Sequence, residues 1–447
     1  MITGIVVALL LAVIVFQYMI IKIDKDKRHE AGHDKLTGLC NPEHLMQKMK
    51  ELPDKKKNRL IIYSDIAEFK LINGIEKGNE ILLKQADIIK KHAVDGYLYG
   101  RVGEDHFVVI ADEATFNEEH LYECRETLQN VLSDSVYNVR VCFGIYRTDN
   151  MNESLSFMCD KASFAVASIK DDTHSFIAYY DDTMLEAAIK YKTIVDEFDD
   201  AIKAGEFKMY LQPQISAKTR RLTGAEALVR RIKPDGTIIS PIDFIPVYEK
   251  SGLISRLDRY IWEQAAAKLG EWKKAGINMS ISVNISPKDF YYIDIFNTFA
   301  GLIKKYDIEP SNLKIEITET TIMSDVPNLM GELEELRKAG FTLEMDDFGS
   351  GYSSLNTLKD INVDVLKVDM GFIKETKNVK KSRIILASVI KMAKELNLLI
   401  ITEGVETEEQ VDNLTKLGCD VFQGYYFSKA IDVNEFEKRY LYRKKAG

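Results

Sequence analysis

The sequence predicts an α/β protein with three parts: an N-terminal transmembrane helix, a first α/β domain and a second domain that is a (β/α)8 TIM-type barrel. Residues 1–21 contain no charged side chain and are long enough to cross a bilayer as a helix. Strand-like and helix-like patterns then alternate, and the last 240 or so residues hold eight strand-like segments. That length and rhythm are typical of a TIM barrel.

The first segment, residues 1–21, reads MITGIVVALLLAVIVFQYMII. Four basic residues follow it directly, namely Lys22, Lys25, Lys27 and Arg28. The positive-inside rule then places the rest of the chain in the cytosol. A cleaved signal peptide fits poorly, because no basic stretch precedes the apolar run and no small-residue cleavage site follows it. We therefore expect a single-pass protein of the inner (cytoplasmic) membrane, with residues 22–33 as a charged juxtamembrane linker.

The first α/β domain is expected at residues 34–181. Its strands are predicted at 59–66, 97–103, 106–111, 139–146 and 175–181, with helical patterns between them such as 78–93. Only Glu104 and Asp105 separate the second strand from the third, which indicates a hairpin. A helical linker at residues 182–205 leads to the second domain.

The barrel is expected at residues 206–447. Its eight strands are predicted at 207–216, 222–230, 279–286, 313–319, 342–349, 363–369, 398–406 and 420–427, with helices between them such as 257–276. Polar side chains stand toward the ends of these strands, in the order Glu226, Asn284, Glu316, Asp346, Asp347, Lys367, Glu403 and Gln423. In a TIM barrel the active site lies at the C-terminal ends of the strands. A single acid after a strand is more often a helix N-cap or a solvated turn, but that interpretation does not account for the whole series.

Composition restricts the ligands that the chain can take. The net charge of −9 argues against a general nucleic-acid binder, so no nucleic-acid polymer is expected as a partner. All seven histidines lie at or before His174, so the barrel has none. A metal site there would use oxygen ligands, which suit Mg²⁺ or Mn²⁺ and disfavour a histidine zinc site. The five cysteines include no CxxC pair and are expected to be reduced.

The run Glu226-Ala227-Leu228-Val229-Arg230 resembles the EAL signature of cyclic di-GMP phosphodiesterases. Further family signatures follow in the family's order, and the resemblance covers about residues 199–440. It implies a hydrolase that converts cyclic di-GMP to linear pGpG with two Mg²⁺ or Mn²⁺ ions. It also implies a homodimer, and a barrel in which one strand runs antiparallel.

The resemblance further implies roles for individual residues. Glu226, Asn284, Glu316 and Asp346 would ligate one ion, Asp346 would bridge, Asp347 would hold the second, and Glu403 and Gln423 would complete the site. Lys367, with Glu226 and Glu403, would be catalytic and lie close to the attacking water. Gln212, Leu228 and Arg230 would contact the substrate. Glu319 would anchor the loop at 347–354. Glu406 would be a supporting carboxylate that contacts the metal ligands and not the metal. Two divalent ions suit phosphodiester hydrolysis because they clamp phosphoryl oxygens and ionise water.

Residues 34–41, DKLTGLCN, resemble the opening of GGDEF domains, which in active form join two GTP molecules into cyclic di-GMP. The resemblance covers residues 34–181 and implies a ferredoxin-like α/β fold. The signature hairpin reads GEDHF, so the domain departs from the pattern at two positions. Glu104 replaces a glycine that lets the nucleotide approach, and His106 replaces a glutamate ligand. Asp65, Asp105 and Asn73 keep two metal carboxylates and a guanine contact.

We therefore expect the first domain to have lost cyclase activity and to act as a regulatory or dimerisation module, with GTP as a regulatory ligand or with no ligand. For His106, a solvated hairpin residue is favoured over a new metal ligand. Two alternatives stay open for the whole chain. One is a non-catalytic cyclic di-GMP receptor, against which the intact acidic residues argue, and the other is a residual cyclase.

Overall fold

The computed structural model describes residues 31–52, 54, 57–67, 75–92, 94, 96–132, 140–170, 172, 174–323, 328–348, 358, 361–369 and 379–442. The chain divides into two compact units between Lys190 and Tyr191. The membrane segment predicted at residues 1–21 lies outside the described residues. Within the described ranges, no helix combines the length and apolar character that a membrane span requires. The transmembrane helix therefore stays a prediction.

The first unit is built on one five-stranded sheet, and each strand lies in a segment where the sequence predicts one. The strands are β1 (Arg59–Ala67), β2 (Leu98–Arg101), β3 (Phe107–Asp112), β4 (Arg140–Thr148) and β5 (Ile177–Tyr179), in the order β2-β3-β1-β4-β5. The central strand β1 is antiparallel to both neighbours, and β5 is parallel to β4. The register pairs Arg101 of β2 with Phe107 of β3, so the predicted hairpin is present, but residues 102–106 separate its strands instead of only Glu104 and Asp105.

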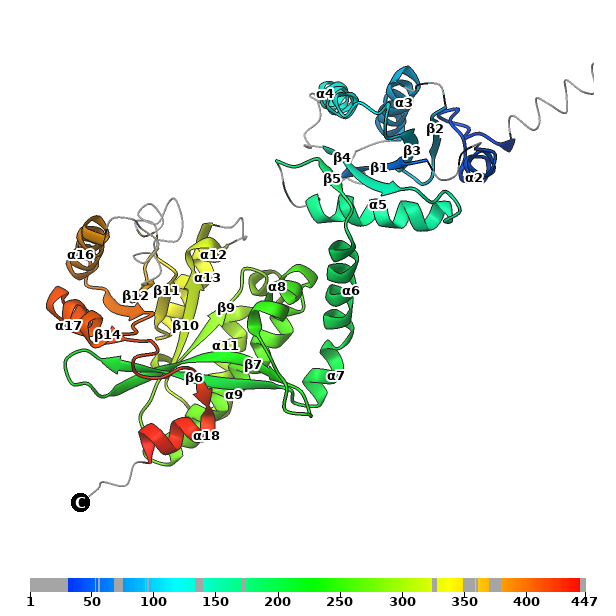
Figure 1. Ribbon diagram of the computed structural model, residues 1–447. Coiled ribbons are helices and arrows are strands. Elements are labelled where there is room, and N and C mark those ends of the chain that lie inside the picture. Colours follow the sequence, from blue (N-terminus) through cyan, green and yellow to red (C-terminus); the bar gives the residue numbers. More distant parts are fainter. Residues whose placement is uncertain are drawn as a thin grey trace, which may run out of the picture. The chain divides into compact units, whose positions relative to one another are not determined.

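Helices cover both faces of this sheet (Figure 1). Helices α3 (Ile75–His92) and α4 (Glu119–Leu132) pack on one face, and α2 (Pro42–Lys50) and α5 (Leu155–Ile169) pack on the other. Strand β1 serves both layers, because Ile62 faces the first pair of helices and Ile61 the second. That alternation is the period of two expected of a strand buried on both sides.

The second unit contains a closed barrel of eight strands. They are β6 (Phe207–Ser216), β7 (Leu222–Ile232), β9 (Ile281–Ile285), β10 (Leu313–Thr318), β11 (Leu343–Asp346), β12 (Val365–Asp369), β13 (Leu399–Glu403) and β14 (Val421–Phe422). Pairing runs in that order and returns from β14 to β6. Strand β6 is antiparallel to β7 and β14, and the other pairs are parallel. The expected single antiparallel strand is confirmed.

One expectation for the barrel is wrong. No helix separates the first two strands, because β6 and β7 form a long antiparallel hairpin. Two short strands that the sequence does not predict extend the sheet, β8 (Ile238–Ile239) beside β7 and β15 (Ile431–Asp432) beside β6. A pattern of alternating apolar residues fits a strand in either direction, so it does not distinguish a parallel partner from an antiparallel one.

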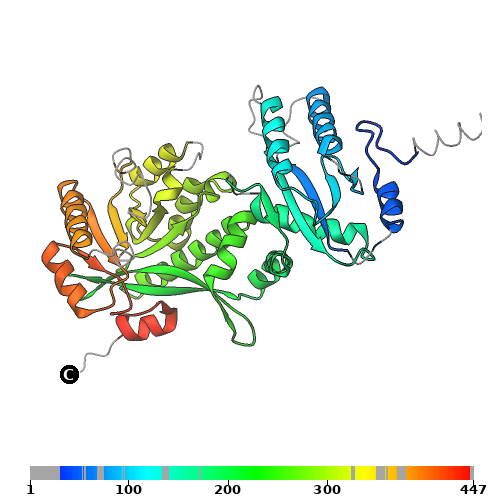
Figure 2. The ribbon, with the colours of Figure 1, turned by 45° about the horizontal axis from the view of Figure 1, so that its top comes forward.

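Helices surround the barrel on the outside, as Figure 2 shows from a second direction. They are α8 (Pro241–Ser251), α9 (Ile254–Lys274), α10 (Asp289–Tyr292), α11 (Ile295–Tyr306), α12 (Glu319–Met323), α13 (Leu329–Lys338), α16 (Val379–Glu395), α17 (Glu408–Leu417) and α18 (Val433–Phe436). The linker region is helical, with α6 (Asp182–Asp196) and α7 (Phe198–Lys203). Helix α9 is tied to the barrel by Trp262, whose indole nitrogen donates to the carbonyl oxygen of Asn284 at 2.9 Å.

The barrel strands separate apolar from polar side chains along their length. On β10, Ile315 and Ile317 join the apolar core while Glu316 between them is buried among polar groups. On β12, Leu366 and Val368 do the same on either side of the fully buried Lys367. Since successive residues of a strand point to opposite faces, the helices cover the apolar set and the barrel interior receives the polar one.

Candidate active site

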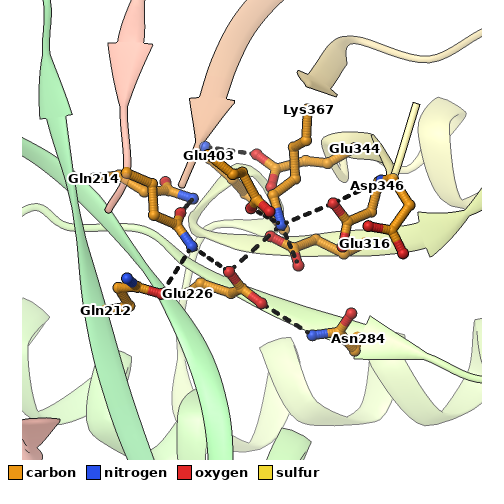
Figure 3. Close-up of polar contacts among 12 residues, drawn as sticks. Gln212, Gln214, Glu226, Asn284, Glu316, Glu344, Asp346, Lys367 and Glu403 are labelled. Carbon is orange, nitrogen blue, oxygen red and sulfur yellow. Dashed lines mark hydrogen bonds and ion pairs between the residues drawn. The ribbon is translucent and has the colours of Figure 1, made fainter. Parts of the chain in front are cut away.

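The ammonium group of Lys367 lies among four carboxylates inside the barrel (Figure 3). Its Nζ atom is 2.6 Å from Oε1 of Glu403, 3.0 Å from Oε2 of Glu316, 3.3 Å from Oδ1 of Asp346 and 3.4 Å from Oε2 of Glu226. The lysine side chain is fully buried. A buried lysine is costly unless it is paired, and these four partners account for its position.

The strand register brings the four acids together. Asn284 of β9 is the partner of Glu316 on β10, and Glu316 in turn is level with Glu344 on β11. Two residues further along, Thr318 is level with Asp346. Because neighbouring parallel strands end at the same edge, side chains of several strands converge there.

A second network fixes Glu226. The Nδ2 atom of Asn284 donates to its Oε1 atom at 3.3 Å, and the amide of Gln423 donates to its Oε2 atom. The same Gln423 nitrogen is 3.3 Å from Oε1 of Gln212, and Nε2 of Gln214 donates to Oε1 of Gln423 at 3.3 Å. The structure thus brings together the predicted residues Glu226, Asn284, Gln423 and Gln212.

Asp346 and Asp347 end strand β11 in different conformations. Asp346 is buried, while Asp347 has a positive φ of 56° and its backbone N–H donates to Oδ1 of Asp346 at 2.9 Å. A positive φ is uncommon outside glycine, and Asp is among the residues that tolerate it. Burial, followed by the charge of Asp346, raises the pKa of the Asp347 carboxyl.

Acidic side chains outnumber ammonium groups in the cluster. Burial raises the pKa of Glu316 well above its usual range, and Glu226 adds to the effect. Burial, together with Asp346 and Glu226, raises the pKa of Glu403 to about 8. Burial opposes the charge of Lys367, but its acidic neighbours raise the pKa of the ammonium well above the usual value. When the four carboxyl groups are ionised, a further cation beside the ammonium would reduce the repulsion among them.

The donor set suits a divalent ion with a preference for oxygen. The carboxylates of Glu226, Glu316 and Asp346 lie near Asn284 and Gln423, whose amide groups offer further oxygen atoms as metal ligands. The barrel contains no histidine. Mg²⁺ and Mn²⁺ prefer such oxygen ligands. The residues present therefore fit the metal that the sequence implies.

An open pocket of about 410 Å³ adjoins this cluster. Its lining consists of Gln212, Glu226, Leu228, Asp369, Glu403, Gly404, Glu406, Gln423, Gly424 and Tyr425. The predicted substrate residues Gln212 and Leu228 are in this lining, and so is Glu406. Arg230 is not, because its guanidinium donates to the Val229 carbonyl oxygen at 2.7 Å and lies over the Tyr210 ring.

Four residues of the site escaped the sequence analysis. Gln214 lies two positions after Gln212 on β6, so alternation along the strand signals that it faces the same interior. Glu344 is fully buried on β11 and pairs with Lys314 at 2.9 Å, and an acid inside an apolar run was the available signal. Asp369 ends the apolar run of β12, and Tyr425 of the pocket lining has no distinctive pattern.

Glu319 begins helix α12 and is buried. The loop that it was expected to anchor has its positions 349–354 outside the described residues, so that role stays a prediction.

In the first unit, the residues of the altered signature lie together. The Nε2 atom of His106 is 3.4 Å from Oδ2 of Asp65 and 3.5 Å from Oδ1 of Asp105, and the Lys170 ammonium lies 3.1 Å from Asp65. The hydrogen bond to Asp65 is the main cause that raises the pKa of His106. The sequence favours a solvated His106, and in the structure its side chain is 34% exposed and lies between two carboxylates. Glu104 is exposed, and Asn73 lies outside the described residues.

Comparison with known proteins matches both units. Residues 195–430 match the EAL domain family, and residues 31–175 match the family described as diguanylate cyclase, GGDEF domain. The chain is 30% identical over 430 residues to signaling protein YkoW of Bacillus subtilis, covering 93% of this chain and 54% of that protein. It is 28% identical over 419 residues to the bifunctional diguanylate cyclase/cyclic di-GMP phosphodiesterase MucR of Pseudomonas aeruginosa, covering 91% of this chain and 61% of that protein.

Among solved structures, the PaMucR phosphodiesterase in complex with c-di-GMP is similar to the second unit. It shares 32% sequence identity with a TM-score of 0.52, and the match covers 55% of this chain and 99% of that one. The chain spans only 54% and 61% of the length of these two curated relatives.

Proposed function

Because this chain belongs to the EAL domain family and carries a GGDEF domain ahead of the barrel, we propose that it is a phosphodiesterase that hydrolyses cyclic di-GMP to linear pGpG. The observation that carries the proposal is the buried Lys367 with four carboxylates, which lies beside an open pocket at the ends of the barrel strands. In the reaction, water supplies the oxygen that forms a new bond to phosphorus. One phosphodiester bond breaks, and the leaving sugar oxygen receives a proton.

Two divalent ions, Mg²⁺ or Mn²⁺, are part of this proposal. Glu226, Asn284, Glu316 and Asp346 would hold one ion, with Asp347, Glu403 and Gln423 completing the site. When bound, the ions would stabilise negative charge on the phosphoryl group and make water acidic enough to attack it. The excess of buried carboxylates over ammonium groups supports this assignment.

The chain's own residues would position the reactants. Lys367 carries a positive charge where the carboxylates converge, and it would orient the nucleophile and offset charge that develops in the transition state. Gln423 holds Glu226 in place through its amide, while Gln214 holds the amide of Gln423. Gln212 and Leu228 line the pocket in which one part of the nucleotide would lie. Arg230 would reach a phosphate only after its guanidinium releases the Val229 carbonyl oxygen.

The remaining proposals concern the rest of the chain. Residues 1–21 would anchor the protein in the cytoplasmic membrane as a single span, with both domains in the cytosol, and two copies would form a homodimer. The first domain would be inactive as a cyclase and would act as a regulatory or dimerisation module, with GTP as its regulatory ligand. The exposed Glu104 and the pairing of His106 with Asp65 support the loss of the cyclase site.

The deciding experiment follows pGpG formation by the purified full chain with Mg²⁺ or Mn²⁺, with and without GTP. Glu226→Ala should lower the rate by about two orders of magnitude or more, because the site loses a ligand and an anchor of its amide network. Glu395→Ala is the matched control, since this exposed glutamate of the same barrel pairs only loosely with Lys391 at 3.9 Å. Tight binding of cyclic di-GMP without hydrolysis would replace this proposal with the receptor alternative.

A further inference from the structure

Three metal-ligating side chains gather at the start of the first unit, outside the barrel site. They are His33, Cys40 and His44, and one ligand atom from each lies within 4.8 Å of the others. Cys40 is buried at 5% exposure, and the two histidines are half-buried. Neither of the functions discussed above uses these residues.

The backbone holds His33 and Cys40 side by side. The two residues form an antiparallel bridge, in which Asp34 N–H donates to the Leu39 carbonyl oxygen at 2.8 Å and Asn41 N–H to that of Gly32 at 3.0 Å. These hydrogen bonds flank the pair rather than join it. In such a non-hydrogen-bonded pair the two side chains lie on the same face and are closer than at other positions. The imidazole and the thiol are therefore neighbours by construction.

The third side chain enters from helix α2. Asn41 is the N-cap of this helix, and its side-chain oxygen accepts from the N–H of His44 at 2.9 Å. The Asn41 amide nitrogen also donates to the Ala31 carbonyl oxygen at 2.8 Å, which ties the first turn of the helix to the segment at residues 31–33. The His44 ring centroid lies 5.1 Å from that of His33.

Gly32 makes room for the second imidazole. A Cβ atom at this position would lie 3.0 Å from Cγ and Nδ1 of His44. That separation is tighter than ordinary van der Waals contact, so a larger residue would displace the ring. The close approach of ring and backbone is thus permitted by the absence of a side chain at residue 32.

From this geometry we propose that His33, Cys40 and His44 form a site for a divalent transition metal, with Zn²⁺ as the ion that the donor set fits best. One thiolate and two imidazoles are ligands that zinc prefers, and they are poor ligands for Mg²⁺. A tetrahedral zinc site separates ligand atoms by roughly 3.3–3.6 Å, given Zn–S and Zn–N distances of about 2.3 and 2.0 Å. Metal binding would draw the three ligand atoms, which now lie within 4.8 Å of one another, to that spacing. The fourth position would take water or an added ligand.

Metal binding here would act on the chain that enters the first unit. The Cys40 carbonyl oxygen accepts the N–H of Arg101 at 2.9 Å, so the site is fixed to strand β2, which leads to the hairpin at residues 104–106. An ion shared by residues 33, 40 and 44 would cross-link the segment that precedes helix α2 to the helix itself, and the Cys40–Arg101 hydrogen bond would connect this site to strand β2. Because a ligand that binds only the folded state stabilises it, Zn²⁺ should raise the unfolding temperature of the first unit.

The test uses Co²⁺ as a spectroscopic substitute for Zn²⁺, added to the purified full chain. A cobalt–thiolate charge-transfer band reports only metal that is bound to cysteine. The barrel carboxylates and the Asp65 cluster contain no cysteine, so they cannot give this band. We expect the wild-type protein to show one such band at one Co²⁺ per chain, and Zn²⁺ to displace it.

Variants show whether the charge-transfer band arises from Cys40. Cys40→Ser should abolish it, and His33→Gln and His44→Gln should weaken Co²⁺ binding by about 10-fold or more. Cys124→Ser, which removes another buried cysteine of the same unit, should leave the band unchanged. His44→Cys keeps three ligands and should retain a band, which guards against variants that merely unfold. A wild-type protein without a thiolate band, or a band that survives in Cys40→Ser, would overturn the proposal.

Discussion

The Nζ atom of Lys367 lies 2.6 Å from Oε1 of Glu403, which is the shortest of its four carboxylate contacts. The two residues come from neighbouring parallel strands, and Glu403 stands two positions beyond Ile401, the register partner of Lys367. The lysine therefore reaches toward the C-terminal edge of the barrel to meet the acid. Its charge is held where the strand ends converge, which is the location where a TIM barrel carries out its chemistry.

Lys367→Met should abolish most hydrolysis of cyclic di-GMP. The substitution keeps a long apolar stem but removes the only ammonium that contacts the four carboxylates among the described residues. Loss of one such charge that stabilises a transition state typically costs about 100- to 1000-fold in kcat. The measurement is the rate of pGpG formation at saturating substrate and Mg²⁺.

The matched control for that variant is Lys391→Met, which removes an exposed lysine of helix α16. It should retain the wild-type rate. If Lys367→Met kept a rate within a few-fold of wild type while remaining folded, the lysine would have only a structural role in the barrel.

Arg231→Met should destabilise the barrel. The Arg231 guanidinium is buried and bridges two acids, at 2.7 Å from Oε2 of Glu197 and 2.9 Å from Oε2 of Glu206. Removing one partner from a buried ion pair typically costs about 3–5 kcal/mol. The loss here should lie toward the lower end of that range, because Glu197 is 37% exposed and keeps Lys233 at 3.6 Å. Urea unfolding, followed by the fluorescence of the two buried tryptophans in α9, gives the free energy of unfolding.

Arg256→Met provides the comparison for that measurement. Arg256 also pairs with an acid, Asp199 at 2.6 Å, but both side chains are more than half exposed. An exposed pair contributes at most about 1 kcal/mol. Equal losses in the two variants would show that burial is not what makes Arg231 matter.

Asp258→Asn should stabilise the protein above about pH 6. Asp258 and Asp289 share a hydrogen bond in a buried region, and burial raises the pKa of both carboxyl groups, that of Asp289 to about 6. The folded state therefore keeps a proton that the unfolded state releases, so wild-type stability is lost as pH rises from about 4 through the folded pKa. An asparagine at position 258 supplies the hydrogen-bond donor at every pH.

The expected gain for Asp258→Asn is on the order of 2 kcal/mol at pH 8 and close to zero at pH 4. Chemical unfolding at the two pH values measures it. A variant that is less stable than wild type at pH 8 would show that the two carboxyls do not share a proton.

The candidate barrel site was largely predictable because its residues lie in or directly after the predicted strands, in sequence order. Glu226, Glu316 and Lys367 each stand out as a polar residue within an apolar run. The direction of β6 was not predictable from local pattern, because alternation is the same in parallel and antiparallel strands. It was expected only through the family resemblance.

The positions of several other side chains depend on tertiary contacts, which local sequence patterns do not reveal. His106 was expected in solvent because it stands in a hairpin, but strand β1 lies beside β3 and brings Asp65 within 3.4 Å of its ring. Gln214 and Glu344 each carry a local signal, alternation from Gln212 and an acid inside an apolar run, but only the barrel register shows that they join the polar cluster. Arg230 stays a predicted substrate contact, and in this structure its guanidinium donates to the Val229 carbonyl oxygen.

Gly424→Ala should lower both stability and activity. A Cβ atom at Gly424 would lie 2.2 Å from the carbonyl oxygen and 2.3 Å from the nitrogen of Val405, and backbone atoms cannot yield as a flexible side chain does. The neighbouring Gln423 carbonyl oxygen accepts the Val405 N–H at 3.1 Å, so the clash would move the residue whose amide holds Glu226. We expect a loss of about 1–3 kcal/mol in the free energy of unfolding and a fall in kcat.

Gly301→Ala is the control for Gly424→Ala, because no atom lies within 4 Å of its added Cβ. This variant should be neutral or slightly stabilising in helix α11. Urea unfolding and pGpG formation measure both variants, and a Gly424→Ala protein with wild-type stability and rate would show that the 423–426 segment shifts without disturbing Glu226.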